Sequence, residues 1–335
     1  PVAVGGEDRD RRTTYLVGTS CAGIVRARIH LRSLTYRFTN VSLPLADVSI
    51  LECQPDPEEI TMTTTRSLTD RTVCVTGASS GLGRSIAERL GSGGAHVFLA
   101  GRTREPMDES AEKIVAAGGR ADVATFDVTD TAALQGWIQG AADSTGRLDV
   151  LVNNAGFGVA GQTIADGDPE FWRGMLETNV LALAVGCQAA IRAMRATNSE
   201  GNIVNISSVA AIGRESGVYG ATKHAVNCIN STLRRELEDD TIRVTSIMPG
   251  AFATNFARNM DRETVQGYAD MLGITDLEMD EQGRLPQEQI DQFQAAMSTA
   301  YGDADHVATA VEYVVAQPIE LNIEELVIRP QKSLF

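Results

Sequence analysis

Short apolar runs alternate with longer amphipathic stretches from residue 72 to the end of the chain. The apolar runs predict strands at 72–76, 96–100, 121–127, 148–153, 202–207, 242–248 and 325–329. The stretches between them predict helices that include 84–91, 105–117, 131–144, 169–194 and 218–237. Continuous apolar strands that alternate with helices are typical of a parallel sheet covered on both faces. The pattern therefore predicts one α/β domain, a doubly wound parallel seven-stranded sheet (Rossmann fold) with helices on both faces.

Residues 1–61 differ from the rest because they show no sustained hydrophobic period. Strand-like pieces occur at 24–29 and 48–51, and a segment with two prolines at 55–59 breaks any longer element. A new pattern begins at Met62. We therefore interpret 1–61 as an N-terminal extension, either disordered or upstream of a natural start at Met62, and 62–335 as a single domain. The alternative interpretation is a genuine N-terminal regulatory segment.

A glycine-rich turn follows the first strand of this domain. Gly77, Gly81 and Gly83 lie between an apolar strand and an amphipathic helix. Such glycines permit a tight turn, let the backbone approach a pyrophosphate and let the helix pack closely on the strand. The helix N-terminus then offers free N–H groups to phosphates. The turn predicts dinucleotide binding, with Ser79, Ser80 and Leu82 also at the cofactor, and no Gly-Lys-Ser/Thr follows that would indicate a P-loop.

The end of the second strand bears on the choice of dinucleotide. An NAD-preferring domain usually carries an acidic residue there, which binds the ribose hydroxyls. Here the strand is followed by Arg102, and the first carboxylate is Glu105. An arginine can pair with a 2′-phosphate as a bidentate donor. The sequence therefore favours NADP(H) over NAD(H), with Arg102 at the 2′-phosphate.

Tyr219 and Lys223 are candidates for acid–base chemistry. They are four positions apart on a predicted helix, so they share one face. A neighbouring ammonium favours the phenolate, and we expect it to lower the tyrosine pKa from its reference of about 10. Tyr219 could then exchange a proton with a carbonyl or alcohol oxygen. Ser208 follows the fifth predicted strand and could bind the same oxygen; Ser207 is the alternative, because only one of the two can face the site.

With these motifs in order along residues 68–335, the sequence resembles the short-chain dehydrogenase/reductase family. The motifs are 76–83, Asp127-Val128, Asn153-Asn154-Ala155-Gly156, Asn179, Ser208, Tyr219 to Lys223 and Pro249-Gly250. The resemblance implies four catalytic residues, Asn179, Ser208, Tyr219 and Lys223. It implies that Lys223 holds the nicotinamide ribose and that Asn179 supports a water for proton release. It also implies cofactor contacts from Asp127, Val128, Asn154, Ala155, Gly156, Tyr219, Lys223, Pro249, Gly250, Phe252 and Thr254.

Two segments near the implied substrate side bear on specificity. From Ser208 to Tyr219 is eleven positions, fewer than in many members of the family. We therefore expect the intervening loop either to leave that side of the pocket open or to place Ser208 slightly differently. Residues 251–305 correspond by resemblance to a lid over the substrate, and they mix aromatic and apolar residues with many acids. We expect either a hydrophobic lid over an apolar or aromatic carbonyl compound or an extra packed helical pair.

Charge and cysteine content exclude several other classes. The net charge is −15, and such an acidic surface repels nucleic acids and anionic membranes. Five cysteines are spread along the chain without metal-ligand or disulfide spacing. We therefore expect a cytoplasmic protein with no metal site, no nucleic-acid partner and no membrane partner. By resemblance it is a homodimer or homotetramer that uses the 169–194 and 218–237 helices at one interface.

These observations predict an NADP(H)-dependent oxidoreductase that interconverts a ketone or aldehyde and its alcohol, a small-molecule substrate, with Tyr219 as acid/base. One alternative is a 3-oxoacyl thioester reductase, which shares the catalytic residues. The other is a non-catalytic NADP(H)-binding regulator. Regulators of this fold typically lose the tyrosine or the lysine, and this chain keeps both.

Overall fold

The computed structural model describes residues 15–20, 23–27, 65–158, 163–213, 215–250, 252, 266, 289 and 302–331. The chain divides into two units, Pro1–Ile60 and Thr61–Phe335. In the first unit, strand β1 (Tyr15–Ser20) pairs antiparallel with β2 (Gly23–Ala27). The second of these strands overlaps the strand-like piece expected at 24–29, whereas the piece at 48–51 lies outside the described residues.

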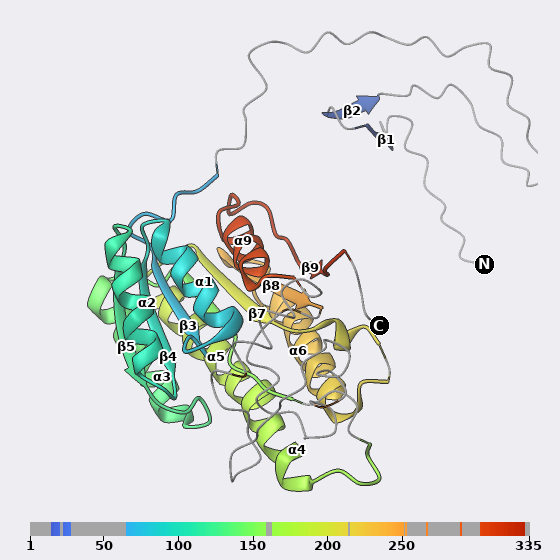
Figure 1. Cartoon of the computed structure of the whole chain (residues 1–335). Coiled ribbons are helices and arrows are strands. Elements are labelled where there is room, and N and C mark those ends of the chain that lie inside the picture. The colour runs from blue at the N-terminus through green and yellow to red at the C-terminus, as the bar shows by residue number, and fades with distance from the viewer. Residues whose placement is uncertain are drawn as a thin grey trace, which may run out of the picture. The chain divides into compact units, whose positions relative to one another are not determined.

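The second unit is built on a seven-stranded parallel sheet (Figure 1). Its strands are β3 (Thr72–Thr76), β4 (His96–Gly101), β5 (Arg120–Thr125), β6 (Val150–Asn153), β7 (Gly201–Ile206), β8 (Ile242–Pro249) and β9 (Glu325–Ile328). The strand order is β5-β4-β3-β6-β7-β8-β9, and every pair of neighbours runs parallel. All seven predicted strands are confirmed within a few residues. The order reverses between β3 and β6, and ligands of such sheets bind at this switch point.

Helices connect the strands close to their predicted positions. They are α1 (Gly81–Ser92), α2 (Glu105–Ala116), α3 (Thr131–Thr145), α6 (Gly217–Glu236) and α9 (Ala304–Val315). The stretch predicted as one helix over 169–194 differs, because it consists of α4 (Pro169–Leu176), a π-helical turn (Glu177–Ala182) and α5 (Leu183–Ala196). Amphipathic periodicity does not distinguish a π turn from the α-helix around it, and such turns are frequent at functional sites.

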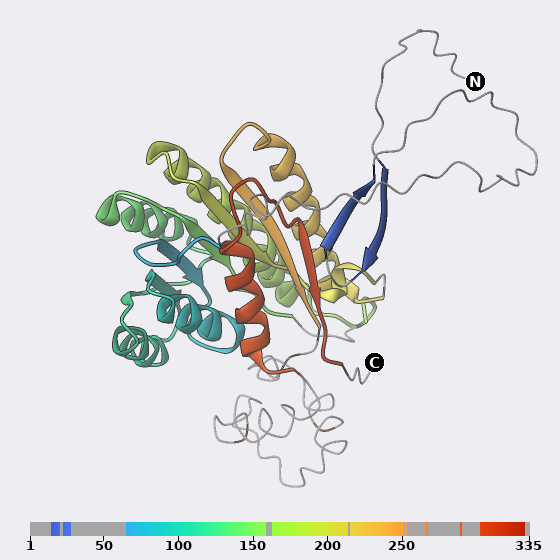
Figure 2. The same ribbon diagram turned by 90° about the horizontal axis from the view of Figure 1, so that it is seen from above.

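The core forms two layers, one on each face of the sheet (Figure 2). Successive strand residues point to opposite faces. On β3, Val73 and Val75 therefore join the layer of α1, α2 and α9, whereas Cys74 joins the layer of α3, α5 and α6. All three side chains are fully buried. This two-sided burial explains why the strands are apolar at consecutive positions, and it confirms the doubly wound fold.

The run Pro169–Ala196 is the one helical stretch of the described residues that is long and apolar enough to cross a membrane. Its α5 part contacts β6 and β7 and packs against α3. Cys187, Ala190 and Met194 of this part belong to the core layer on that face. The run therefore resembles the core helix of a globular domain, which has the same length and composition.

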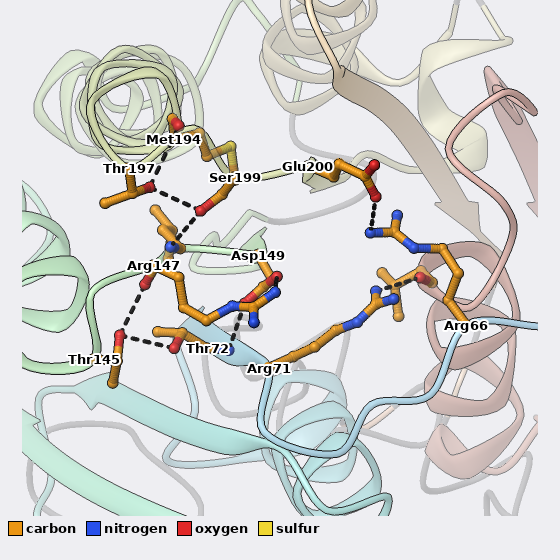
Figure 3. Close-up of polar contacts among 12 residues, drawn as sticks. Arg66, Arg71, Thr72, Thr145, Arg147, Asp149, Met194, Thr197, Ser199 and Glu200 are labelled. Atoms are coloured by element: carbon orange, nitrogen blue, oxygen red, sulfur yellow. Dashed lines mark hydrogen bonds and ion pairs between the residues drawn. The ribbon is translucent and has the colours of Figure 1, made fainter.

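Polar side chains join the amino ends of β3, β6 and β7 (Figure 3). We call residues 66–72, 145–149 and 197–200 the amino edge. The Asp149 carboxylate is fully buried, and it accepts hydrogen bonds from the Thr72 backbone N–H at 2.8 Å and from the Arg147 guanidinium at 2.6 and 2.7 Å. Arg71 donates to the Val315 carbonyl at the end of α9, and Arg66 pairs with Glu200. This network fixes where the strands begin.

Candidate active site

The glycine-rich turn after β3 has the geometry that phosphate binding requires. Gly77 and Gly81 have φ of 65° and 53°, which favours glycine. A Cβ on Gly83 would lie 2.3 Å from the Gly77 carbonyl oxygen, so α1 can pack this closely only with glycine there. Ser80 precedes α1 without a side-chain cap bond, and the first turn of α1 contains no acid. The turn therefore leaves a helix N-terminus that suits a phosphate.

Thr76 and Asn154 clamp this turn to the end of β6. The Asn154 side-chain amide donates to the carbonyls of Thr76 and Gly77 at 2.9 and 3.2 Å. The Thr76 hydroxyl accepts the backbone N–H groups of Asn154 and Ala155 at 3.0 and 3.1 Å. The predicted cofactor residue Asn154 thus holds the turn through its side chain. The sequence analysis assigned no role to Thr76. Its position directly before the first glycine could have indicated that it holds the turn.

The candidate adenosine side lies at the end of β4. Arg102 is exposed just beyond this strand and forms no hydrogen bond or ion pair with the described residues, whereas Arg104 pairs with Asp108 at 3.1 Å. A Cβ on Gly101 would lie 3.2 Å from the Ser79 hydroxyl, so the glycine turn passes beside this strand end. The geometry therefore leaves one guanidinium, that of Arg102, available for an anionic ligand here.

Two further predicted cofactor segments follow β5 and β8, which lie on opposite sides of the switch point between β3 and β6. After β5, the Asp127 carboxylate accepts the Thr129 N–H at 2.9 Å and the Thr129 hydroxyl at 2.8 Å, and Val128 is buried. After β8, the Gly250 N–H donates to the Ile328 carbonyl at 2.7 Å. Both segments therefore place backbone at the carboxyl ends of the strands, where the predicted cofactor lies.

The Phe252 side chain does not lie as expected for a residue that meets the nicotinamide. It is 7% exposed and packs in the core layer of α1 and α9. A Cβ on Gly302 would lie 2.4 Å from its ring. Any contact of Phe252 with a cofactor would therefore come from its backbone. Thr254 and most of the expected lid over 251–305 lie outside the described residues.

Asn179 lies in the π-helical turn between α4 and α5 and is 1% exposed. Its side-chain oxygen accepts the Phe157 N–H at 3.0 Å, and its nitrogen donates to the Phe157 carbonyl at 2.8 Å and to the Thr222 hydroxyl at 3.1 Å. The Thr222 hydroxyl in turn donates to the Tyr219 carbonyl at 2.7 Å. The amide of Asn179 thus joins the segment after β6 to α6. Thr222 and Phe157 were not singled out from the sequence.

The structure distinguishes between the two serines after β7. The Ser208 hydroxyl is hydrogen-bonded to the Tyr219 hydroxyl and also accepts the Ala210 N–H at 3.1 Å. The Ser207 hydroxyl lies 3.4 Å from the Lys223 backbone carbonyl, to which it donates, and is buried. Ser208 is therefore the serine that the structure brings to Tyr219.

Lys223 is buried one helical turn beyond Tyr219 on α6. Its ammonium lies 5.8 Å from the centroid of the Tyr219 ring and donates to the Ile206 carbonyl at the end of β7 at 2.9 Å. A Cβ on Gly156 would lie 3.5 Å from this ammonium and 3.0 Å from the Asn179 side-chain oxygen. The fold therefore gathers Asn179, Ser208, Tyr219 and Lys223 beside the segment that follows β6.

The pKa values of the pair differ from the sequence-based expectation. Burial raises the pKa of Tyr219, and the hydrogen bond with Ser208 opposes this increase. Burial also lowers the pKa of Lys223 to about 8. Desolvation of Tyr219 thus outweighs the expected stabilisation of its phenolate by Lys223. The ring contact explains the difference, because the ammonium lies over the ring and bonds a carbonyl rather than the phenol oxygen.

A side chain of α6 holds the short loop between Ser208 and this helix. It begins with a 3₁₀ turn (Val209–Ala211), which Ser208 caps. His224 lies 2.8 Å from the Gly213 carbonyl through its Nε2, so this nitrogen carries the proton. His224 thus braces the loop that follows Ser208.

A separate groove of about 700 Å³ lies at the other end of the strands. Its lining includes Thr72, His96 and Arg120, the first residues of β3, β4 and β5, together with Trp137 of α3. None of the predicted site residues lines it. Within the described ranges, no three His, Cys, Asp or Glu side chains gather as a metal site would require.

Comparison with known proteins agrees with this geometry. The sequence profile described as short chain dehydrogenase matches residues 71–264. An uncharacterized oxidoreductase of Staphylococcus saprophyticus is 31% identical over 267 residues, which cover 78% of this chain and 98% of the relative.

Two solved structures are similar over the same region. A metagenomic short-chain oxidoreductase in complex with NADP has 28% identity and a TM-score of 0.61, and the match covers 80% of this chain and all of that chain (100%). A short chain dehydrogenase from Burkholderia cenocepacia in complex with NADP has 29% identity and a TM-score of 0.62, and the match covers 79% and 98%. Sequence motifs, fold and relatives thus agree, and the chain belongs to the short-chain dehydrogenase family of oxidoreductases.

Proposed function

We propose that this protein is an NADP(H)-dependent oxidoreductase that interconverts a ketone or aldehyde and its alcohol, with Tyr219 as the proton donor and acceptor. One observation carries the proposal. The Tyr219 hydroxyl bonds Ser208 and its ring contacts the buried Lys223 ammonium, and all three lie beside the segment after β6. A tyrosine–serine–lysine group near a predicted phosphate-binding turn has little structural purpose, since burying an ammonium without a counter-ion is costly.

The residues present suit a dinucleotide phosphate. The turn from Gly77 to Gly83 exposes backbone where any Cβ at Gly83 would collide, and α1 begins there without a cap or an acid. Arg102 is available at the end of β4, where an NAD-preferring domain would carry an acid. The two similar structures that were solved with NADP support the choice of cofactor.

The chain's own groups can then move one proton for each turnover. NADPH supplies a hydride to the carbonyl carbon when it is bound. Tyr219 donates its hydroxyl proton to the carbonyl oxygen, which becomes the alcohol hydroxyl. Ser208 donates a hydrogen bond that stabilises the resulting phenolate, and the Lys223 charge favours it further. In the reverse direction the phenolate takes the alcohol proton.

Turnover with purified full-length protein tests this proposal. We would follow the NADPH absorbance band with a panel of aromatic, aliphatic and keto-acid carbonyl compounds, and repeat each assay with NADH. Oxidation of NADPH by any member of the panel, faster than oxidation of NADH, supports the proposal. Tight NADPH binding without turnover on the panel, followed by turnover of a 3-oxoacyl thioester, would instead indicate a thioester reductase. Binding without turnover of either class would indicate a regulator.

A further inference from the structure

Gly158 packs directly against the ring of Tyr219. This glycine is buried, two positions beyond the predicted cofactor residue Gly156. A Cβ at Gly158 would lie 2.0 Å from Cδ2 of the Tyr219 ring and 2.7 Å from both Cε2 and Cγ. Separations below 3.0 Å are not tolerated between a Cβ and a packed ring. The Tyr219 ring can therefore lie here only because residue 158 is a glycine, which has a hydrogen in place of a Cβ.

The requirement concerns space and not backbone conformation. Gly158 is not among the glycines with positive φ, so an L-residue could adopt its backbone angles. Alanine would thus be acceptable at this position if the tyrosine ring were absent. The three heavy atoms nearest to a Cβ at Gly158 all belong to the Tyr219 ring, so the main cost of a side chain there arises from the proposed proton donor.

Other side chains hold Phe157, the residue before Gly158, in place. Asn179 bonds both the N–H and the carbonyl of Phe157, at 3.0 and 2.8 Å. The Phe157 ring also contacts the Phe171 ring of α4 edge-on, with 5.4 Å between centroids. Because these contacts fix the residue before Gly158, a side chain at Gly158 would displace the Tyr219 ring more readily than the backbone.

We propose that Gly158 is a positioning residue, which sets the orientation of the Tyr219 ring and so the place of its hydroxyl beside Ser208. The expected effect of this residue on kcat rests on the proposed function, whereas its expected effect on packing does not. Its packing consequence can be measured without substrate. A displacement of about 1 Å in a reacting group can cost about 100-fold in rate, so we expect Gly158→Ala to lower kcat by about this factor.

A thermal-stability cycle tests the packing. Its four proteins are the wild type, Gly158→Ala, Tyr219→Ala and the double variant. Gly158→Ala should lower Tm clearly in the wild type but have little effect in Tyr219→Ala, because the ring that it would meet is gone. If Gly158→Ala fails to fold while the double variant folds, the proposal is supported equally. A Tm decrease of the same size in both backgrounds, or no decrease in the wild type, would overturn it.

Gly201→Ala is a matched control. Gly201 begins β7 at the far end of the sheet, and a Cβ there would lie 2.3 Å from the Met194 sulfur. This variant also crowds a buried glycine, but its effect on Tm should be the same with and without the Tyr219 ring.

Kinetics test the positioning role once a carbonyl substrate has been found. Gly158→Ala should lower kcat about 100-fold while the Kd for NADPH stays near that of the wild type. In a Tyr219→Phe background it should cause little further loss, because the hydroxyl that it misplaces is already absent. An unchanged kcat, or an equal loss in both backgrounds, would contradict the role. If the wild type turns over no substrate, the proposed function is contradicted. The thermal-stability cycle then still decides whether Gly158 positions the Tyr219 ring.

Discussion

The two ends of the sheet use polar groups in opposite ways. At the amino edge, Asp149 bonds both Arg147 and the Thr72 backbone, so its charge is matched within the protein. At the carboxyl ends of the strands, the buried Lys223 ammonium bonds a single carbonyl, that of Ile206. No carboxylate of the described residues pairs with it. The buried Asp149 charge at the amino edge thus has its partners within the protein, whereas the buried Lys223 ammonium at the carboxyl end keeps donors that a ligand can use.

This difference separates stability from function within one sheet. A buried charge that is paired and hydrogen-bonded can hold a fold together, whereas a buried charge that lacks a counter-ion weakens it. Lys223 illustrates the second case, because burial alone lowers its pKa to about 8. We therefore expect that removing a polar group at the carboxyl end lowers turnover without lowering stability, and that removing one at the amino edge lowers stability without lowering turnover.

The largest expected effect is on turnover at Tyr219. Tyr219→Phe removes the proton donor and keeps the ring, so kcat should fall by about 10²–10⁴-fold, as is typical for the loss of general acid catalysis. The Kd for NADPH should stay close to that of the wild type, which fluorescence titration would check. If the variant keeps its turnover, a group other than Tyr219 must donate the proton.

The next effect is a pH dependence of stability at Lys223. The unfolded lysine titrates near pH 10.4 and the folded one near 8, so between these values the unfolded chain binds more protons and stability rises with pH. Below about pH 8 the full cost of the buried charge is present. Lys223→Met removes this cost. The stability advantage of the variant should therefore shrink by about 2 kcal/mol between pH 7 and pH 10.

Chemical denaturation at several pH values measures this advantage. Lys113→Met, at a lysine with a 58% exposed side chain that pairs with Glu88, is the matched control and should show no comparable slope. A constant difference between Lys223→Met and the wild type would mean that the lysine is not desolvated as the structure indicates.

At the amino edge, Asp149→Ala should destabilise the fold and leave the chemistry intact. The substitution leaves the buried Thr72 N–H without its acceptor, which costs about 1–3 kcal/mol. The free energy of unfolding should fall by about this amount, while kcat per folded molecule stays at the wild-type value. Asp240→Ala removes the partly exposed partner of Arg195, whose own side chain is 55% exposed, and should have much less effect on stability. A loss of kcat in folded Asp149→Ala would link the two ends of the sheet.

The smallest effect concerns the choice of cofactor. Arg102→Ala should raise the KM for NADPH by about tenfold, because it removes a charge-assisted contact at an exposed site, and leave the KM for NADH unchanged. Arg104→Ala is the control, since Arg104 already pairs with Asp108. Steady-state kinetics with both cofactors would check the ratio. An equal effect of the two variants would remove Arg102 from the phosphate site.

The sequence predicted most of the fold because the central strands are buried on both faces. Strands β3, β4 and β6 are nearly continuous apolar runs, and the helices between the strands are amphipathic, so type and order could both be inferred. The π turn at Asn179 could not, because it changes hydrogen bonding without changing the hydrophobic period. The sequence also could not reveal the depth to which Tyr219 is buried, and therefore the direction of its pKa shift.

The sequence could predict those site residues that belong to a short motif of chemically reactive side chains. The structure brings Ser208, Tyr219 and Lys223 together as expected. It also shows supporting contacts that no local pattern predicted, such as Thr76 beneath Asn154 and Gly158 against Tyr219. These contacts join residues that are distant along the chain. Only the folded arrangement reveals them.

The most direct test of the separation between the two ends measures one quantity in two backgrounds. We would determine the loss of kcat/KM caused by Tyr219→Phe in the wild type and again in Asp149→Ala, under conditions in which both are folded. The account predicts the same loss in each, because substitutions at distant sites without shared partners are additive. A loss that differs by more than about tenfold between the backgrounds, or no loss in either, would contradict it.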